Sequence, residues 1–173
     1  DLRLKEDMSW ADAGHEVAFG QKIYKKIPAF HASEKPIRVV HGKVNIGVKG
    51  EDFDCLFSML SGGLVSYRYA GKEMIEKIPM PNFWRAPVDN DNGSMAPARY
   101  AQWKIASMYI SHRNGVMFDN VPTKVEEKDN TVTVTYTYFM PTTPAGKCQV
   151  SYTVFGDGTI ETKLMYDPVE GLP

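Results

Sequence analysis

The segment from Pro81 to Gly93 carries the residues whose types and spacing are best suited to chemistry. It combines two aromatic residues, one arginine, two aspartates, three asparagines and two prolines. Acidic and amide side chains of such segments bond neighbouring backbone amides, and Arg85 can form a bidentate pair with Asp89 or Asp91. Gly93 can adopt a positive φ angle. The pattern predicts a rigid loop that ends in a flexible point at Gly93. The alternative is a loop that is held by its own hydrogen bonds and has no further function.

The run from Asp89 to Gly93 superficially resembles the start of a calcium-binding loop of the EF-hand type. With Asp89 as the first ligand, Gly93 falls at the fifth position, where a ligand is needed. Ser94 stands where that loop requires glycine, and Tyr100 stands where it requires glutamate. The four histidines are scattered, without a pair at i,i+4. We therefore predict no metal site and no cofactor in this segment.

Other catalytic patterns are missing from the sequence. There is no G-x-S-x-G motif, and neither Cys55 nor Cys148 has a His and Asn arrangement nearby that suggests a thiol enzyme. The carboxylate pairs Glu51-Asp52 and Glu126-Glu127 lie in polar segments, which favours a solvated surface. We therefore predict no catalytic residue. The two cysteines have no metal-like spacing, and both a disulfide and two buried free thiols stay open.

Length and charge restrict the classes of partner. The 173 residues include 20 Lys and Arg against 21 Asp and Glu, a formal net charge of -1, and no run of five like charges occurs. This balance speaks against a nucleic-acid or anionic-membrane partner. The apolar stretches are far shorter than the roughly 20 residues that cross a bilayer, so we expect no membrane span.

Hydrophobic periodicity predicts antiparallel strands through most of the chain. From residue 131 to 138, valine and tyrosine alternate with threonine, a period of two in strongly β-favouring residues. Further strands are expected at 44–48, 52–60, 62–69, 147–155 and 159–166. The last two are joined by Gly156-Asp157-Gly158, which suits a tight hairpin turn. The sequence predicts an all-β fold, an antiparallel β-sandwich.

Two helical candidates exist, and the better one runs from Met95 to Ser107. The residues predicted to share one face of this helix are Ala98, Ala101, Ile105 and Trp103.

Three sequence stretches resemble β-galactosidases of glycoside hydrolase family 2. The run from Phe83 to Gly93 is similar to the R-A-P-x-D-N-D-x-G motif that opens the C-terminal domain of that family. Upstream, Trp10 to Ala18 resembles the W-[AS]-x-A-G-H-x-x-A segment near the end of the preceding immunoglobulin-like domain. Val169 to Pro173 resembles a connection halfway through the C-terminal domain. The stretches occur in the family's order, and together they span almost the whole chain.

The resemblance implies a domain organisation. Residues 1–30 would be the terminal strands of an immunoglobulin-like domain, 31–40 a linker, and 41–173 the N-terminal half of a C-terminal β-supersandwich like that of galactose mutarotases. The chain is then expected to be cut at both ends. A half-domain exposes strand edges and apolar faces, so we expect the isolated chain to self-associate or to be marginally stable.

The resemblance also implies a function for a larger enzyme that contains this chain. That enzyme would hydrolyse terminal non-reducing β-D-galactose residues by a retaining mechanism, with both catalytic glutamates on a barrel outside this chain. The chain itself would be non-catalytic. Its motif loop would lie near the mouth of the substrate pocket, and the candidate pocket residues are Trp84, Arg85, Asp89, Asn90, Asp91 and Gly93.

The expected partners follow from the same resemblance. They are the catalytic barrel and the second half of the C-terminal domain, together with a galactoside substrate, and the parent enzyme is expected to be a homo-oligomer in a bacterial cytoplasm or periplasm. Family members bind divalent or monovalent cations on other domains. The alternative is a free-standing carbohydrate-binding or structural β-sandwich module, because fold alone does not decide function.

Overall fold

The computed structural model describes residues 1–22, 33–114, 119–120 and 123–172. The chain divides into two units, Asp1–His31 and Ala32–Pro173, and each is described by itself.

The N-terminal unit is a small antiparallel hairpin. Strand β1 (Leu2–Arg3) pairs with β2 (Glu16–Ala18). Between them, the ring of Trp10 meets the ring of His15 edge to face, with centroids 5.6 Å apart. None of the described residues of this unit is buried. A two-stranded hairpin without a core is at best marginally stable by itself.

The first sheet of the larger unit is a five-stranded antiparallel meander in the order β3-β4-β5-β6-β7. Its strands are β3 (Arg38–His41), β4 (Asn45–Lys49), β5 (Phe53–Ser58), β6 (Gly63–Tyr69) and β7 (Lys72–Glu73). The turn from β6 into β7 passes through Ala70 and Gly71, both with positive φ angles, of 48° and 78°. The sheet begins at Arg38, inside the range that the sequence assigned to a linker.

The second sheet is a four-stranded meander in the order β10-β11-β12-β13. Its strands are β10 (Lys124–Lys128), β11 (Thr131–Met140), β12 (Gly146–Val154) and β13 (Ile160–Tyr166). Along β11, half-buried and buried residues alternate over all ten positions, as the valine, tyrosine and threonine pattern requires. A further pair of short strands, β8 (Arg113–Asn114) and β9 (Asp119–Asn120), precedes this sheet.

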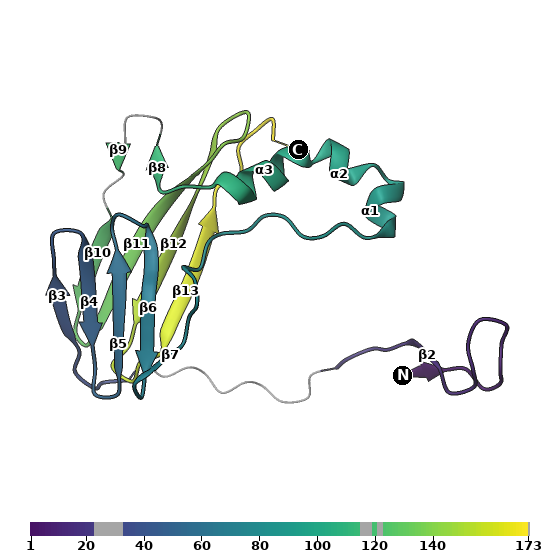
Figure 1. Cartoon of the computed structure of the whole chain (residues 1–173), viewed down its shortest axis with the longest axis horizontal. Coiled ribbons are helices and arrows are strands. Elements are labelled where there is room, and N and C mark those ends of the chain that lie inside the picture. Colours follow the sequence, from purple (N-terminus) through teal and green to yellow (C-terminus); the bar gives the residue numbers. More distant parts are fainter. Residues whose placement is uncertain (23–32, 115–118, 121–122, 173) are drawn as a thin grey trace. The chain divides into compact units, whose positions relative to one another are not determined.

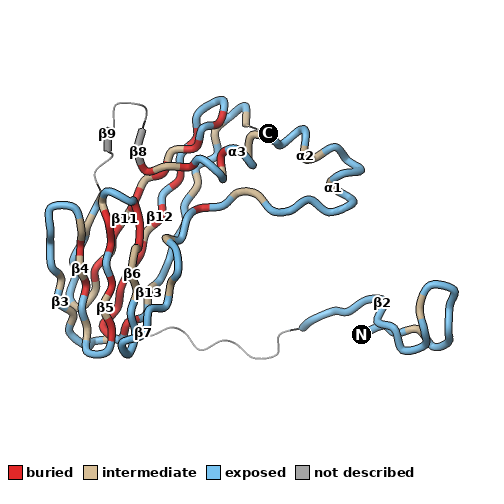
Figure 2. The backbone as a smooth tube through the Cα atoms, viewed as in Figure 1, coloured by how far each residue is buried: buried red, intermediate tan, exposed pale blue. Residues whose placement is uncertain are grey.

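The core lies between the two sheets (Figures 1 and 2). The rings of Phe57 on β5 and Tyr152 on β12 lie 5.7 Å apart across the core. The buried tyrosine hydroxyl groups of β11 bond the turn that leads into β6 and the first residue of that strand, because Tyr138 donates to the carbonyl of Gly62 at 2.5 Å and Tyr136 to that of Gly63 at 3.4 Å. The predicted all-β antiparallel sandwich is confirmed.

Three helices follow β7 and differ from the sequence expectation. They are α1 (Asp89–Gly93), α2 (Ala96–Arg99) and α3 (Ala101–Tyr109). The residues from Asp89 to Gly93 therefore form a short helix and not an open loop. The single helix predicted from Met95 to Ser107 is divided at Tyr100, and the left-handed residue of this region is Met95, with φ 58°, and not Gly93.

Of the four residues predicted to share one face of the helix, Trp103 lies on the inner face, but Ala98, Ala101 and Ile105 are exposed. The inner face of α3 consists of residues with the spacing i, i+3, i+4 and i+7, which brings them to one side of a helix. These residues are Trp103, Ala106, Ser107 and Ile110, all buried or half-buried.

Both cysteines are buried and free, which confirms the thiol alternative. Burial raises the pKa of Cys55 to about 12 and that of Cys148 to about 11. Since the thiolate is the reactive form, both side chains are inert at neutral pH.

Within the part of the chain that the structure describes, no helix has the length and apolar character needed to cross a membrane.

Candidate functional site

An aromatic cluster fixes the start of the motif segment on the sandwich. The ring of Phe83 lies 5.8 Å from that of Trp103 on α3 and 5.6 Å from that of Tyr166 on β13. Trp103 and Tyr166 meet edge to face at 5.9 Å. Each pair is in the range where edge-to-face or tilted aromatic contacts are favourable. The aromatic cluster therefore packs the start of the motif segment against α3 and β13.

Two polar side chains then set the path of the backbone. Ser107 accepts a hydrogen bond from the Phe83 amide at 2.8 Å and donates one to the Trp103 carbonyl at 2.8 Å. Asn82 bonds both backbone groups of Trp84: its Nδ2 donates to the carbonyl at 2.8 Å and its Oδ1 accepts from the amide at 3.1 Å. Because both backbone groups of Trp84 are engaged by one side chain, the direction of the chain at this tryptophan is fixed.

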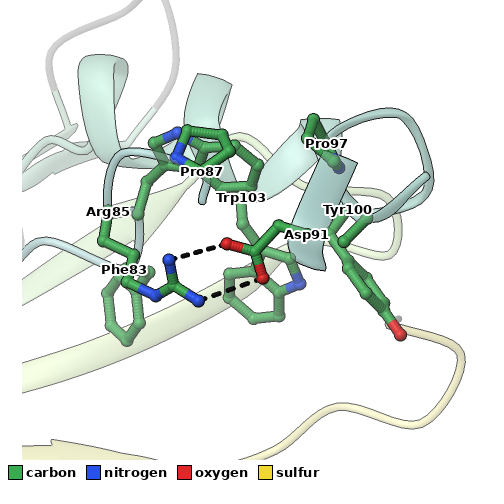
Figure 3. A pocket seen from close by; sticks show the side chains of 9 residues that line it. Phe83, Arg85, Pro87, Asp91, Pro97, Tyr100 and Trp103 are labelled. Carbon is green, nitrogen blue, oxygen red and sulfur yellow. Dashed lines mark hydrogen bonds and ion pairs between the residues drawn. The ribbon is translucent and has the colours of Figure 1, made fainter. Parts of the chain in front are cut away.

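Arg85 and Asp91 form the predicted bidentate pair (Figure 3). The guanidinium donates from Nη1 to Oδ2 at 2.7 Å and from Nη2 to Oδ1 at 3.0 Å. Asp91 Oδ2 also accepts from the Val88 amide at 2.8 Å, and this bond caps the first turn of α1. Of the two acids proposed as partners of Arg85, Asp91 is the one that binds it.

The bonds to Asp91 lower the pKa of its carboxyl below the ordinary value of 3.8, chiefly through the Val88 amide and then through Arg85. A carboxyl with a lowered folded-state pKa stabilises the fold fully above the ordinary pKa and loses this contribution as the pH falls through the lowered one. We expect the Arg85–Asp91 pair to be intact above about pH 4 and to open only at lower pH.

The titration can be followed by the side-chain carboxyl ¹³C resonance of Asp91. Substitution Arg85→Ala should move the midpoint upward, toward the ordinary value. A midpoint at or above 3.8 in the unsubstituted chain would contradict the lowered pKa.

The motif segment and the helices enclose an open cleft of about 540 Å³. It is lined by Phe83, Trp84, Arg85, Pro87, Asp91, Ala96, Pro97, Tyr100 and Trp103. Figure 3 shows the Arg85–Asp91 pair with aromatic and proline side chains around it. Aromatic faces beside a few fixed polar groups are typical of small-molecule sites.

Three of the six candidate pocket residues line this cleft: Trp84, Arg85 and Asp91. Asp89, Asn90 and Gly93 belong to α1 but are not among the lining residues. Phe83, Tyr100 and Trp103 also line the cleft but were not among the predicted site residues. For Tyr100 and Trp103 a signal was available, because residues three positions apart on a predicted helix lie on the same face.

The acidic pairs named from the sequence lie on the surface, and each pair has a member that contacts a basic residue. Glu51 pairs with Lys35 at 2.9 Å, and Glu127 contacts His41 at 2.6 Å. Among the described residues, no group of three or more His, Cys, Asp and Glu side chains is arranged to hold a metal ion.

Comparison with known proteins gives a family match over the whole cleft. The family described as the β-galactosidase small chain matches residues 49–173, from the end of β4 through α1, α2, α3 and β13. The chain belongs to the β-galactosidase small chain family. All nine residues that line the cleft fall inside the match.

Individual relatives are named as β-galactosidases or as a subunit of one. A β-galactosidase of Clostridium acetobutylicum is 41% identical over 174 residues, which cover 99% of this chain and 18% of the relative. A β-galactosidase of Halalkalibacterium halodurans is 44% identical over 172 residues, covering 98% of this chain and 16% of the relative. A β-galactosidase small subunit of Latilactobacillus sakei is 36% identical over 153 residues, covering 82% of this chain and 48% of the relative.

The chain therefore spans less than a fifth of the two long relatives and about half of the small subunit. The family segment thus occurs both inside long β-galactosidase chains and in a protein named as a separate subunit.

Proposed function

We propose that this chain is a non-catalytic segment of a β-galactosidase of glycoside hydrolase family 2, which hydrolyses terminal non-reducing β-D-galactose residues with retention of configuration. The observation that carries the proposal is the family match over residues 49–173, supported by relatives that cover 98% and 99% of the chain. The assignment to family 2 is supported by the run from Arg85 to Gly93, which resembles the R-A-P-x-D-N-D-x-G motif of that family.

The chemistry of the cleft supports the non-catalytic role. A retaining glycosidase uses two carboxyl groups about 5 Å apart, one as nucleophile and one as general acid. Among the described residues that line the cleft, Asp91 is the one carboxylate. Its oxygens are bound by Arg85 and the Val88 amide, and its pKa is lowered. A general acid needs a pKa near the working pH, so Asp91 is unsuited to protonate a leaving group.

In this proposal the cleft forms part of the wall beside the galactoside pocket, and Arg85 and Asp91 hold that wall in shape. The partners of the chain are the catalytic barrel and the second half of the C-terminal domain, in an enzyme that forms homo-oligomers. Residues 1–30 are proposed as the terminal strands of an immunoglobulin-like domain, and the first half of the supersandwich begins with β3 at Arg38 and not, as the sequence suggested, at residue 41.

The test is to locate the covalent intermediate. A chimeric enzyme is made by replacing the stretch of the C. acetobutylicum β-galactosidase that aligns with this chain, about 18% of that protein, with this chain. It is incubated with a 2-deoxy-2-fluoro-β-galactoside, which traps the glycosyl-enzyme of a retaining mechanism, and is digested for mass spectrometry. We expect the sugar on a carboxylate outside the 173 inserted residues. A label within them, or turnover by inversion, would contradict the proposal.

Gly93 is proposed as the hinge of a lid that includes Ser94 to Tyr100. In the described conformation, a Cβ at Gly93 would meet no atom within 4 Å, and its φ angle is not positive. Alanine at this position is therefore compatible with the described conformation, and a kinetic effect would report a second conformation of the segment.

We expect Gly93→Ala in the chimeric enzyme to change kcat and KM together, while the melting temperature of the isolated chain stays within about 2 °C, as is usual for surface substitutions. Steady-state kinetics with a chromogenic β-galactoside measures the effect. Unchanged kcat and KM would contradict the proposal that Gly93 is a hinge.

A further inference from the structure

Helix α3 has apolar residues on two opposite sides. Its inner face, formed by Trp103, Ala106 and Ile110, packs on the sandwich. On the opposite side, Ala101, Ile105 and Met108 follow one another at i, i+4 and i+7, the spacing of a single helical stripe. We call these three residues the outer stripe.

The outer stripe is uncovered in the described chain. Ile105 is 47% exposed and Met108 62%, and the adjoining Tyr109 is 64% exposed. A helix with one apolar face belongs at the surface of a soluble domain, whereas a helix that is apolar on all sides is normally buried. Adjoining exposed apolar residues bordered by polar residues are typical of interaction sites. We therefore expect another protein surface to cover the outer stripe.

We infer that the outer stripe of α3 is the surface by which this segment docks on the part of the β-galactosidase that the large subunit supplies in two-chain enzymes, and this inference rests on the proposed function. The family segment is found inside long chains and also in a separately named small subunit. A segment that occurs in both forms must be held to the rest of the enzyme by non-covalent contact. Ile105 and Met108 provide the buried apolar centre that such contacts need.

Charge beside the stripe specifies the partner surface further. Lys104 is exposed on α3 next to the stripe, and Arg99 is exposed at the end of α2. The surface that fits is an apolar groove with carboxylates on the rim that faces these two cations, because complementary rim charges set the docking orientation.

The experiment uses a two-chain enzyme, in which docking can be titrated. The matched stretch of the L. sakei small subunit is replaced by the corresponding residues of this chain, and the product is titrated into its large partner subunit. Hydrolysis of a chromogenic β-galactoside gives a maximal rate and a concentration for half-maximal activation. The test variant is Ile105→Glu with Met108→Glu, since glutamate keeps the helix propensity of α3. The control is Met74→Glu, at a site 54% exposed outside the helices.

We expect the test variant to raise the half-activation concentration at least 10-fold, with an unchanged maximal rate, and the control to stay within twofold. Circular dichroism of the grafted subunit alone should show the same melting curve for all variants. A second variant, Ile105→Leu with Met108→Leu, keeps the apolar stripe and should bind like the original.

Four results would overturn the inference. An unchanged half-activation concentration for the glutamate variant would show that the outer stripe is not the docking surface, and it would leave the proposed function intact. An equal loss in the Met74→Glu control would show a general charge effect. A dimer of the isolated chain that the glutamate variant dissociates in sedimentation would assign the stripe to a second copy. Failure of the unsubstituted graft to activate the large subunit would overturn the proposed function, and this inference with it.

Discussion

Substitution Gly62→Ala is expected to lower the free energy of unfolding of this chain by about 2–5 kcal/mol, the sum of a backbone and a packing cost. Gly62 has φ +71°, and a Cβ there would lie 2.1 Å from Nδ1 of the buried His112 ring. The Gly62 carbonyl also accepts the hydrogen bond of the buried Tyr138 hydroxyl. A shift of the turn that relieves the overlap therefore disturbs a core hydrogen bond between the two sheets.

Gly71→Ala is the matched control for this prediction. Gly71 has a similar φ angle, +78°, but a Cβ there would meet no atom within 4 Å. The free energy of unfolding of Gly71→Ala should fall only by the backbone cost of about 1–2 kcal/mol. Urea denaturation of the two variants and of the unsubstituted chain measures the difference. Equal losses at Gly62 and Gly71 would show that the region around His112 accommodates a methyl group.

The second large effect is expected at the ion pair of the cleft. In the chimeric enzyme, Arg85→Ala and Asp91→Asn should each lower kcat/KM, by up to about 100-fold, because small displacements of groups around a substrate have effects of this size. The reason is geometric: Asp91 binds Arg85 through both oxygens and also caps α1 through the Val88 amide. Without either partner, the cleft wall loses its fixed shape.

A double-mutant cycle separates this role from independent effects. If Arg85 and Asp91 act as one unit, the double variant should lose hardly more activity than the worse single variant. Asp89→Asn is the matched control, since it makes the same charge change two residues away, outside the cleft lining, and it should retain activity within about twofold. Additive losses, or an equal loss in Asp89→Asn, would contradict a joint positioning role.

The sheets were predictable because their signal is local. In β11 and β12, the alternation of apolar and polar residues coincides with the alternation of burial. The hairpin between β12 and β13 turns at Gly156 to Gly158, where the sequence placed it. The Arg85–Asp91 pair could also be anticipated, since both side chains lie within one turn-rich segment.

The helical region was less predictable for a physical reason. Ala101 and Ile105 form an apolar stripe as regular as that of Trp103, Ala106 and Ile110, so periodicity alone cannot tell which side faces the sandwich. The five residues of α1 are too few for a periodic signal, and its cap depends on the Asp91 carboxylate. The aromatic support of the cleft joins Phe83 to Tyr166 on β13, a contact that depends on the tertiary fold.

The most direct test of the central claim is hydrolysis of a chromogenic β-galactoside by the isolated chain and by the chimeric enzyme, at equal concentration and side by side. We expect turnover by the chimeric enzyme and none by the chain alone. Turnover by the isolated chain would contradict the non-catalytic role, and a catalytic carboxylate pair would then have to lie within these 173 residues.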